Sequence, residues 1–248
     1  MVLRRSLARL AGAGAAQRTL DAAARNAMLN NAVSVASRDA RTAPHASELR
    51  AAIEAGAAKA EARGAGLVAA AGDSRAVAHL QQAAFVLAAF RAVHAHVRDA
   101  VEARAMVAGM LNAHEGVQSV LIRGISLAVH PYGLASDSLT NLARDHGAGF
   151  ESEVAGGEAQ GEGGAGAPDR TELVVRQCFY RDFFEAEGAP ELTKVFCALE
   201  AAPFEAFARD GRVAFDAPKT LAEGDEQCSL RVSKVHGARH PLLAWGAK

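Results

Sequence analysis

Three cysteines are the residues with the greatest potential for chemistry in this chain of 248 residues. They are Cys178, Cys197 and Cys228, and a cysteine thiolate can act as a nucleophile, a metal ligand or half of a disulfide. Their number is odd and no two are closely spaced, which argues against a disulfide framework and against a zinc site of the CxxC type. We therefore expect free thiols in a reducing compartment, with no bound metal and no cofactor.

Two other patterns do not form the sites that their composition suggests. His94 and His96 fall in a predicted helix, where residues two apart point to nearly opposite sides and cannot share a metal ion. The glycine-rich stretch 147–168 is not followed by Lys-Ser or Lys-Thr, and its acidic residues would repel a phosphate. We predict a flexible linker or insertion over residues 147–169 and no nucleotide site.

The elements that position the cysteines lie in the last part of the chain. Residues 171–177 read as a strand, and the helical region that follows ends at Gly211. The segments 212–215 and 227–235 alternate between apolar and polar residues like two strands of a hairpin. The order strand, helix, hairpin predicts an antiparallel sheet packed against helices over residues 170–248.

The preceding residues, 39–146, read as a helical region rich in alanine. Asp73 or Ser74 can cap a helix whose apolar residues recur three or four apart, and this pattern indicates either one long helix or two helices joined near Val97.

The end of this region is mixed in character. Residues 117–129 are rich in branched aliphatic side chains and fit either a strand or a short buried helix. A break at 130–133 and a short helix at 138–144 follow. The predicted fold class is α+β, with alanine-rich N-terminal helices packed with a small antiparallel sheet and a helix at the C-terminus.

The N-terminal segment differs from the rest of the chain in charge. The chain as a whole has 27 basic and 28 acidic residues, which gives no general attraction to nucleic acid. Residues 1–38 carry six arginines against one aspartate, with leucines at helical spacing, which is typical of an organellar transit peptide. We expect a mitochondrial protein, with the chloroplast as the alternative; an exposed basic helix retained on the mature protein has the same composition. The longest apolar run, 83–90, is too short to cross a bilayer, so no transmembrane segment is expected.

A series of short motifs runs through residues 170–235. In chain order they are Cys178-Phe179-Tyr180, Phe183-Phe184, Gly188-Ala189-Pro190-Glu191-Leu192, Phe196-Cys197, Thr220-Leu221-Ala222-Glu223-Gly224 and Cys228-Ser229-Leu230-Arg231. The series resembles the C-terminal pattern of the L-2-amino-thiazoline-4-carboxylic acid hydrolase family. It departs from that pattern where Phe179 replaces a proline, where Glu200 lies nearest to the usual aspartate, and where Ser229-Leu230 replace Asp-Phe. The order of elements is also similar to that of 4-vinyl-reductase-like ligand-binding domains.

The resemblance implies an enzyme that hydrolyses a cyclic amidine. The thiazoline ring opens at its C–S bond and yields an N-carbamoyl amino acid with a free thiol. This chemistry needs a nucleophile at the ring carbon, a proton donor and a cation for the carboxylate of the small-molecule substrate. Two alternatives remain open, which are a non-catalytic module that binds a small molecule or a metal, and a structural subunit of an organellar assembly. The oligomeric state is open as well.

Three residues are candidates for the catalytic groups that the resemblance implies. Cys178 is the first candidate nucleophile because it lies at a strand-to-helix junction, and a helix N-terminus lowers the pKa of a thiol. Cys228 is the second, and Glu200 is a candidate acid or base. The same residues also fit a purely structural role, because free cysteines are usually buried and a helix glutamate is usually solvated.

Three further residues are candidates for binding the substrate. Arg176 and Arg231 are possible anchors for its carboxylate, and Tyr180 is a possible contact. Strand alternation places Arg231 opposite Cys228 and places Arg176 on the same face as Cys178, which favours Arg176. Either arginine also fits a surface position on its strand.

Overall fold

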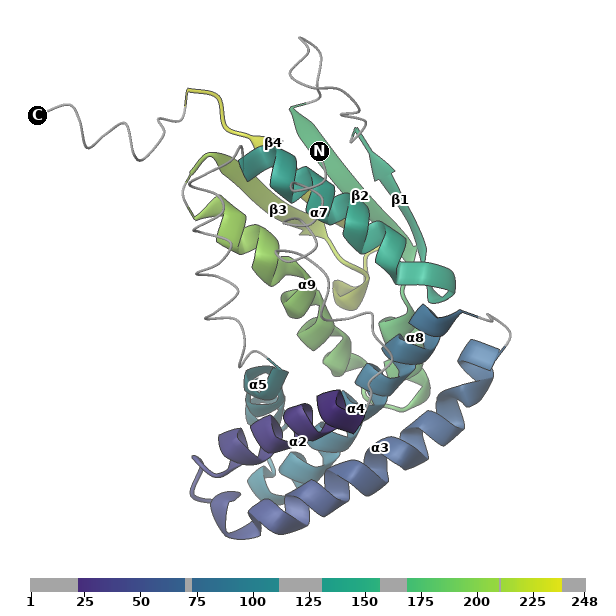
Figure 1. Ribbon diagram of the computed structural model, residues 1–248, viewed down its shortest axis with the longest axis vertical. Coiled ribbons are helices and arrows are strands. Elements are labelled where there is room, and N and C mark those ends of the chain that lie inside the picture. The colour runs from purple at the N-terminus through teal and green to yellow at the C-terminus, as the bar shows by residue number, and fades with distance from the viewer. Residues whose placement is uncertain (1–21, 70–72, 112–130, 157–168, 210, 238–248) are drawn as a thin grey trace, which may run out of the picture. The chain divides into compact units, whose positions relative to one another are not determined.

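A computed structural model of the chain describes residues 22–69, 73–111, 131–156, 169–209 and 211–237 (Figure 1). The described residues form two compact units. The sheet unit comprises residues 131–156, 169–178, 200–209 and 211–237, and the helical unit comprises residues 22–69, 73–111 and 179–199. The boundaries of the units therefore differ from the predicted segments, because residues 39–146 and residues 170–248 are each divided between the two units. Of the predicted transit segment 1–38, residues 1–21 lie outside the described residues.

The sheet unit contains a four-stranded antiparallel sheet. Its strands are β1 (Glu151–Ala155), β2 (Arg170–Gln177), β3 (Val213–Lys219) and β4 (Cys228–Lys234), and their spatial order is β1-β2-β4-β3. The predicted strand and hairpin are confirmed as β2, β3 and β4. Gly211, which has a φ of 75°, ends the preceding helical region as expected, because the left-handed conformation suits glycine. The fold class is α+β.

Strand β1 lies where the composition predicts a flexible linker. Its sequence ESEVA alternates, so that Ser152 and Val154 are partly buried while their neighbours are exposed. Ser152 and Val154 pair with Val175 and Leu173 of β2. The prediction of a linker is therefore wrong for residues 151–155, because this short alternation suffices for pairing with a neighbouring strand. Residues 157–168 lie outside the described residues.

Helix α7 (Pro131–His146) is longer than the predicted helix at 138–144. Pro131 does not break it, because a proline in the first turn lacks only an N–H that has no partner there. Tyr132 Oη and Ser136 Oγ lie 3.1 and 2.8 Å from Thr171 Oγ1 of β2, which fixes the helix on the sheet. The expectation for residues 117–129 lies outside the described residues.

Helices α7 and α9 (Thr193–Ala208) supply the cover of the sheet unit (Figure 1). Residues 200–208 of α9 belong to this unit. The core that they share with the strands consists of fully or nearly fully buried side chains, namely Leu134, Leu139, Leu142, Leu173, Val175, Phe204, Phe207, Val213, Leu230 and Val232. Each such side chain contributes roughly 1.5–3 kcal/mol on burial, so one face of the sheet carries most of the stabilisation.

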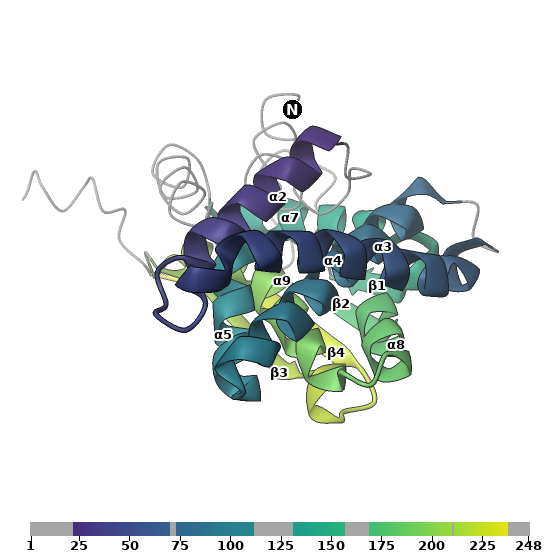
Figure 2. The same ribbon diagram turned by 90° about the horizontal axis from the view of Figure 1, so that it is seen from below.

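The helical unit consists of α2 (Ala22–Ala36), α3 (Ala46–Ala69), α4 (Ser74–Val97), α5 (Ala100–Leu111), α8 (Phe179–Ala186) and the first residues of α9 (Figure 2). Asp73 caps α4, since its side chain accepts a hydrogen bond from the Arg75 N–H. Arg98 adopts a left-handed φ of 62° directly after Val97. The alternative of two helices joined near Val97 is thus confirmed. Short 3-10 helices occur at Ala43–His45, Gly147–Gly149, Pro190–Leu192 and Leu221–Glu223.

Small side chains allow α3 and α4 to approach closely. Ala78, Ala83 and Ala84 are fully buried, and a Cβ added at Gly64 would lie 2.4 Å from Leu80 and 3.1 Å from Phe183. By length and composition alone, α4 could also cross a membrane, but 78% of its most apolar window is buried within the protein. This burial is typical of a core helix.

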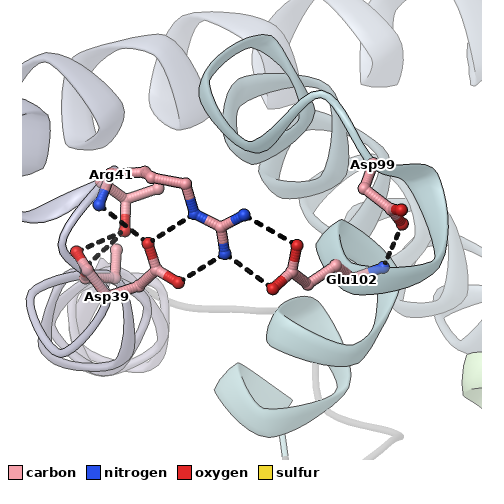
Figure 3. A network of polar contacts seen from close by, with 6 residues as sticks. Asp39, Arg41, Asp99 and Glu102 are labelled. Atoms are coloured by element: carbon pink, nitrogen blue, oxygen red, sulfur yellow. Dashed lines mark hydrogen bonds and ion pairs between the residues drawn. The ribbon is translucent and has the colours of Figure 1, made fainter.

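Charged groups of the helical unit pair at its surface. Arg41 donates to both oxygens of Asp39 and to both oxygens of Glu102 of α5 at 2.7–3.1 Å, and Asp99 caps the same helix at the Glu102 N–H (Figure 3). Hydrogen bonds from Arg41 lower the pKa of Asp39 to about 2. Because these groups are exposed, solvent screens the pairs and they add little to stability.

Candidate functional site

Cys228 opens strand β4 and faces the helix-covered side of the sheet. As the alternation predicts, its side chain lies with Leu230 and Val232 against the core of the sheet unit. Its Sγ accepts a hydrogen bond from the Leu221 N–H at 3.2 Å, in the short turn that connects β3 to β4. The thiol is partly buried and is held at one defined position by this turn.

The surroundings of Cys228 favour the protonated thiol. Burial is the largest cause, and it raises the pKa of the Cys228 thiol above the ordinary value. The Leu221 N–H and the Thr220 hydroxyl oppose this shift, whereas the negative charges of Glu200 and Asp225 add to it. In the resting protein the sulfur therefore carries its proton at neutral pH.

Glu200 of α9 lies beside a histidine, and its charge acts on the Cys228 thiol. Its Oε1 is 3.7 Å from Nε2 of His146. The Glu200 side chain is 25% exposed, so it is within reach of a ligand from solvent. The sequence predicts Glu200 as an acid or base, and in the structure it lies 3.7 Å from an imidazole and acts electrostatically on a thiol.

His146 is a member of the cluster that sequence reasoning missed. It is the last residue of α7, and its side chain is only 2% exposed. Its Nδ1 lies 3.2 Å from Ser152 Oγ, and its ring stacks on Phe150 with centroids 4.2 Å apart. Nε2 is buried and has no partner within hydrogen-bond distance. A lone histidine at a helix end has no sequence pattern, and its partner Glu200 belongs to another helix far along the chain.

Cys178 and Arg176 do not share a face. Arg176 lies on the outer face of β2 and pairs with Glu153 of β1 at 2.5 Å, where both side chains are exposed. Cys178 follows the end of β2, is partly buried and packs against the core of the sheet unit. The expected shared face is absent because the strand ends at Gln177 and the alternation ends with it.

Arg231 lies on the face opposite Cys228, as predicted, and is held there by other residues. Its Nε donates to Glu172 at 3.0 Å, and Glu172 also accepts hydrogen bonds from Ser229 and Arg170. These donors, with Ser229 as the largest cause, lower the pKa of Glu172 to about 2. The guanidinium of Arg231 is therefore already paired with the carboxylate of Glu172.

Tyr180 and Cys197 lie in the helical unit. The Tyr180 hydroxyl is 2.7 Å from Nδ1 of His79 and 3.5 Å from Oε1 of Gln82, and its ring stacks on Phe196 at 3.7 Å. With 2% exposure, Tyr180 is a core residue of that unit. Cys197 is partly buried in α9.

Two surface hollows of about 340 and 300 Å³ lie in the helical unit, and the candidate residues line neither of them. The first lies among α2, α3 and α4 beside the ion pair of Arg25 and Glu61, and the second lies between α3 and α4 beside Arg63 and Arg91. Within the described ranges, no three His, Cys, Asp or Glu side chains converge in a way that could hold a metal ion.

Cys228, Glu200 and His146 form what we call the thiol cluster. They come from β4, α9 and α7, which all belong to the sheet unit. A thiol beside a carboxylate and an imidazole is a set that can supply a nucleophile, a base and an acid. Ser152 and Phe150 hold the imidazole, and Leu221 holds the thiol.

The thiol cluster lies within the part of the chain that is similar to a known family. No curated protein and no solved structure matches the chain. The family match begins in α7 and ends in β4, so it includes His146, Glu200 and Cys228. Residues 134–232 match the family model of L-2-amino-thiazoline-4-carboxylic acid hydrolase, and the resemblance of the motifs is thereby confirmed for this C-terminal part of the chain.

Proposed function

We propose that the protein hydrolyses a cyclic amidine of the L-2-amino-thiazoline-4-carboxylate type to an N-carbamoyl amino acid with a free thiol. The family match over residues 134–232 supports a hydrolase. The observation that carries the proposal is that Cys228, Glu200 and His146 all lie in the sheet unit within that matched segment, with Glu200 3.7 Å from His146 and its charge acting on the Cys228 thiol. Such a set has the groups that opening of an amidine ring requires.

In the proposed reaction, Cys228 Sγ attacks the ring carbon that lies between the nitrogens and the sulfur. The thiol proton passes to Glu200 as the new C–S bond forms. The bond from this carbon to the ring sulfur then breaks, and the ring sulfur receives a proton. Water attacks the same carbon, the Cys228 sulfur leaves and regains its proton, and the product is the N-carbamoyl amino acid. One water molecule is consumed in the overall reaction.

The raised pKa of the Cys228 thiol explains why a base must lie beside it. A thiol that keeps its proton at neutral pH is a poor nucleophile until a neighbouring group removes that proton during the attack. Glu200 is the carboxylate whose charge acts on Cys228 from α9, and it is partly exposed. These two features favour Glu200 as the base.

Neither predicted arginine is assigned to the substrate carboxylate. Arg176 and Arg231 both lie on the outer face of the sheet, whereas Cys228 faces the helix-covered side. A small substrate bound at Cys228 therefore does not reach either guanidinium through the sheet.

The proposal is tested by measuring thiol release from L-2-amino-thiazoline-4-carboxylate. We expect the wild-type protein to release thiol, and Cys228→Ser and Glu200→Gln to lose on the order of 100-fold or more in rate. Cys197→Ser is the matched control and should keep full activity. Cys178→Ser examines the nucleophile that the sequence favours, and loss there with retention in Cys228→Ser would reverse the assignment.

A second measurement follows the covalent intermediate. Mass spectrometry after rapid quenching should find Cys228 heavier by one whole substrate molecule, because ring opening releases no fragment. In Glu200→Gln, removal of the negative charge should speed alkylation of Cys228 by iodoacetamide while turnover falls. Wild-type protein that releases no thiol, or Cys228→Ser with unchanged turnover, would contradict the proposal.

We also propose that residues 1–38 direct the protein to the mitochondrion and that residues 22–36, which form α2 with Leu29 and Ala32 buried, remain on the imported protein. The excess of arginine in residues 1–38 supports import along the membrane potential. Fusion of these residues to a fluorescent protein should give mitochondrial fluorescence, and the same segment with its arginines replaced by glutamine is the control. Diffuse or plastid fluorescence would contradict the proposal.

A further inference from the structure

The imidazole of His146 is fixed on two sides. Its Nδ1 lies 3.2 Å from Ser152 Oγ of β1, and its ring stacks on Phe150 with an interplanar angle of 12°. The side chain is 2% exposed, so the ring has little freedom to turn. Its orientation therefore directs Nε2 toward one place in the protein.

That place is occupied by Glu200, which is too distant for a hydrogen bond. Nε2 is 3.7 Å from Oε1 of Glu200 and is buried without a hydrogen-bond partner. A buried nitrogen without a partner costs roughly 1–3 kcal/mol of stability, and native proteins rarely retain one. This cost indicates that Nε2 acquires a partner when the site is in use.

The reaction proposed above leaves one proton without an assigned carrier. Cys228 loses a proton to Glu200 when it attacks, and the departing ring sulfur needs a proton when the ring opens. Glu200 is the group linked to both, because its charge acts on the Cys228 thiol and its Oε1 lies 3.7 Å from Nε2 of His146. Asp225 is the other charged group that acts on the thiol.

We propose that His146 is the general acid of the reaction. The Nε2–H of its imidazolium form protonates the ring sulfur as the C–S bond breaks, and Nε2 of the neutral imidazole then takes from Glu200 the proton that Cys228 released. One proton thus moves from Cys228 to the ring sulfur, and both His146 and Glu200 return to their initial states. This role rests on the proposed hydrolase function.

Ser152 acts as a positioning residue for His146. In the acid form both ring nitrogens carry protons, so the Ser152 hydroxyl accepts from Nδ1–H at 3.2 Å and leaves Nε2–H to face the reaction. Without that hydroxyl, Nδ1–H loses the partner that holds the ring in this orientation. The bulge in β1 between Glu151 and Ser152 sets the position of this serine.

The test compares leaving groups of different basicity. An alkoxide leaves far less readily than a thiolate, so loss of a general acid should affect 2-amino-oxazoline-4-carboxylate more than the thiazoline. We expect His146→Gln to lower kcat about 10-fold on the thiazoline and about 1000-fold on the oxazoline. Ser152→Ala should give the same pattern at smaller size. His236→Gln, which changes an exposed histidine of the same unit, is the control.

A pH profile on the thiazoline provides a second readout. The alkaline decline of kcat, which reports loss of the acid's proton, should disappear in His146→Gln. Equal losses on both substrates, or an unchanged alkaline limb, would overturn the role of His146 while the hydrolase function stands. Wild-type protein that neither releases thiol nor forms the Cys228 adduct would overturn the hydrolase function and this role with it.

Discussion

Each of the two units buries one histidine among the residues that the structure describes, and the two histidines differ in their hydrogen bonds. His79 in the helical unit is 2% exposed and has the Tyr180 hydroxyl 2.7 Å from its Nδ1. His146 in the sheet unit is equally buried, but its Nε2 has no partner. Burial alone therefore does not distinguish a structural histidine from a reactive one, whereas an unsatisfied nitrogen beside a carboxylate and a thiol does.

The acidic residues of the two units differ in the same way. Asp39 of the helical unit is held by one arginine that is 42% exposed, whereas Glu172 of the sheet unit is held by three donors. Glu200 is also partly buried, but its ionic partner among the described residues is a histidine at 3.7 Å. A carboxylate that is not held by a close cationic partner is suited to exchange protons.

The largest effect should come from replacing the two histidines by phenylalanine. His79→Phe leaves the buried Tyr180 hydroxyl without its 2.7 Å partner and should lower the free energy of unfolding by about 2–3 kcal/mol. His146→Phe removes the unsatisfied Nε2 together with the 3.2 Å contact of Nδ1 with the partly buried Ser152 hydroxyl, so the two effects oppose each other and stability should change by less than about 1 kcal/mol. Thermal or urea unfolding measures both, and losses of equal size would remove the distinction between the two histidines.

A somewhat smaller effect should appear in the pH dependence of stability. The pKa of Glu172 in the folded protein lies below its ordinary value, so the ionised group stabilises the fold above roughly pH 5. This contribution disappears as the pH falls toward 2. Glu172→Gln should therefore lower stability at pH 7 on the order of 2 kcal/mol and have no effect at pH 2.

Asp39→Asn is the matched variant for that experiment. Its pKa is lowered to about 2 as well, but its partner Arg41 is 42% exposed and the hydrogen bonds between them lie at the surface. We expect only a slight change in urea unfolding at pH 7, and this change should vanish in high salt. An effect as large as that of Glu172→Gln would show that exposure does not separate the two acids.

The smallest effect should come from two glycines of α3. Gly64→Ala adds a Cβ that meets Leu80 and the Phe183 ring, and it should destabilise the helical unit by about 1 kcal/mol. Gly66→Ala meets nothing within 4 Å and should stabilise by about 0.5–1 kcal/mol, because alanine favours a helix. Melting temperatures that shift in the same direction would contradict the close packing of this unit.

The sequence predicts those elements whose signals are local. The alternation of β2 and β4, the cap at Asp73 and the glycine at 211 each depend on a few adjacent residues, and all are confirmed. Strand β1 was not predicted because glycine and glutamate dominate the composition around it. His146 could not be predicted, because its significance arises only when α7 and α9 bring it to Glu200.

The family match and the folded units have different boundaries, and this difference determines which fragments of the chain can fold alone. Residues 134–232 match the family, but residues 179–199 within them belong to the helical unit, where Tyr180 contacts His79 and Phe183 lies near Gly64. A fragment limited to the matched residues would expose these aromatic side chains to water. We therefore expect a chain that carries the matched segment without the alanine-rich helices to aggregate.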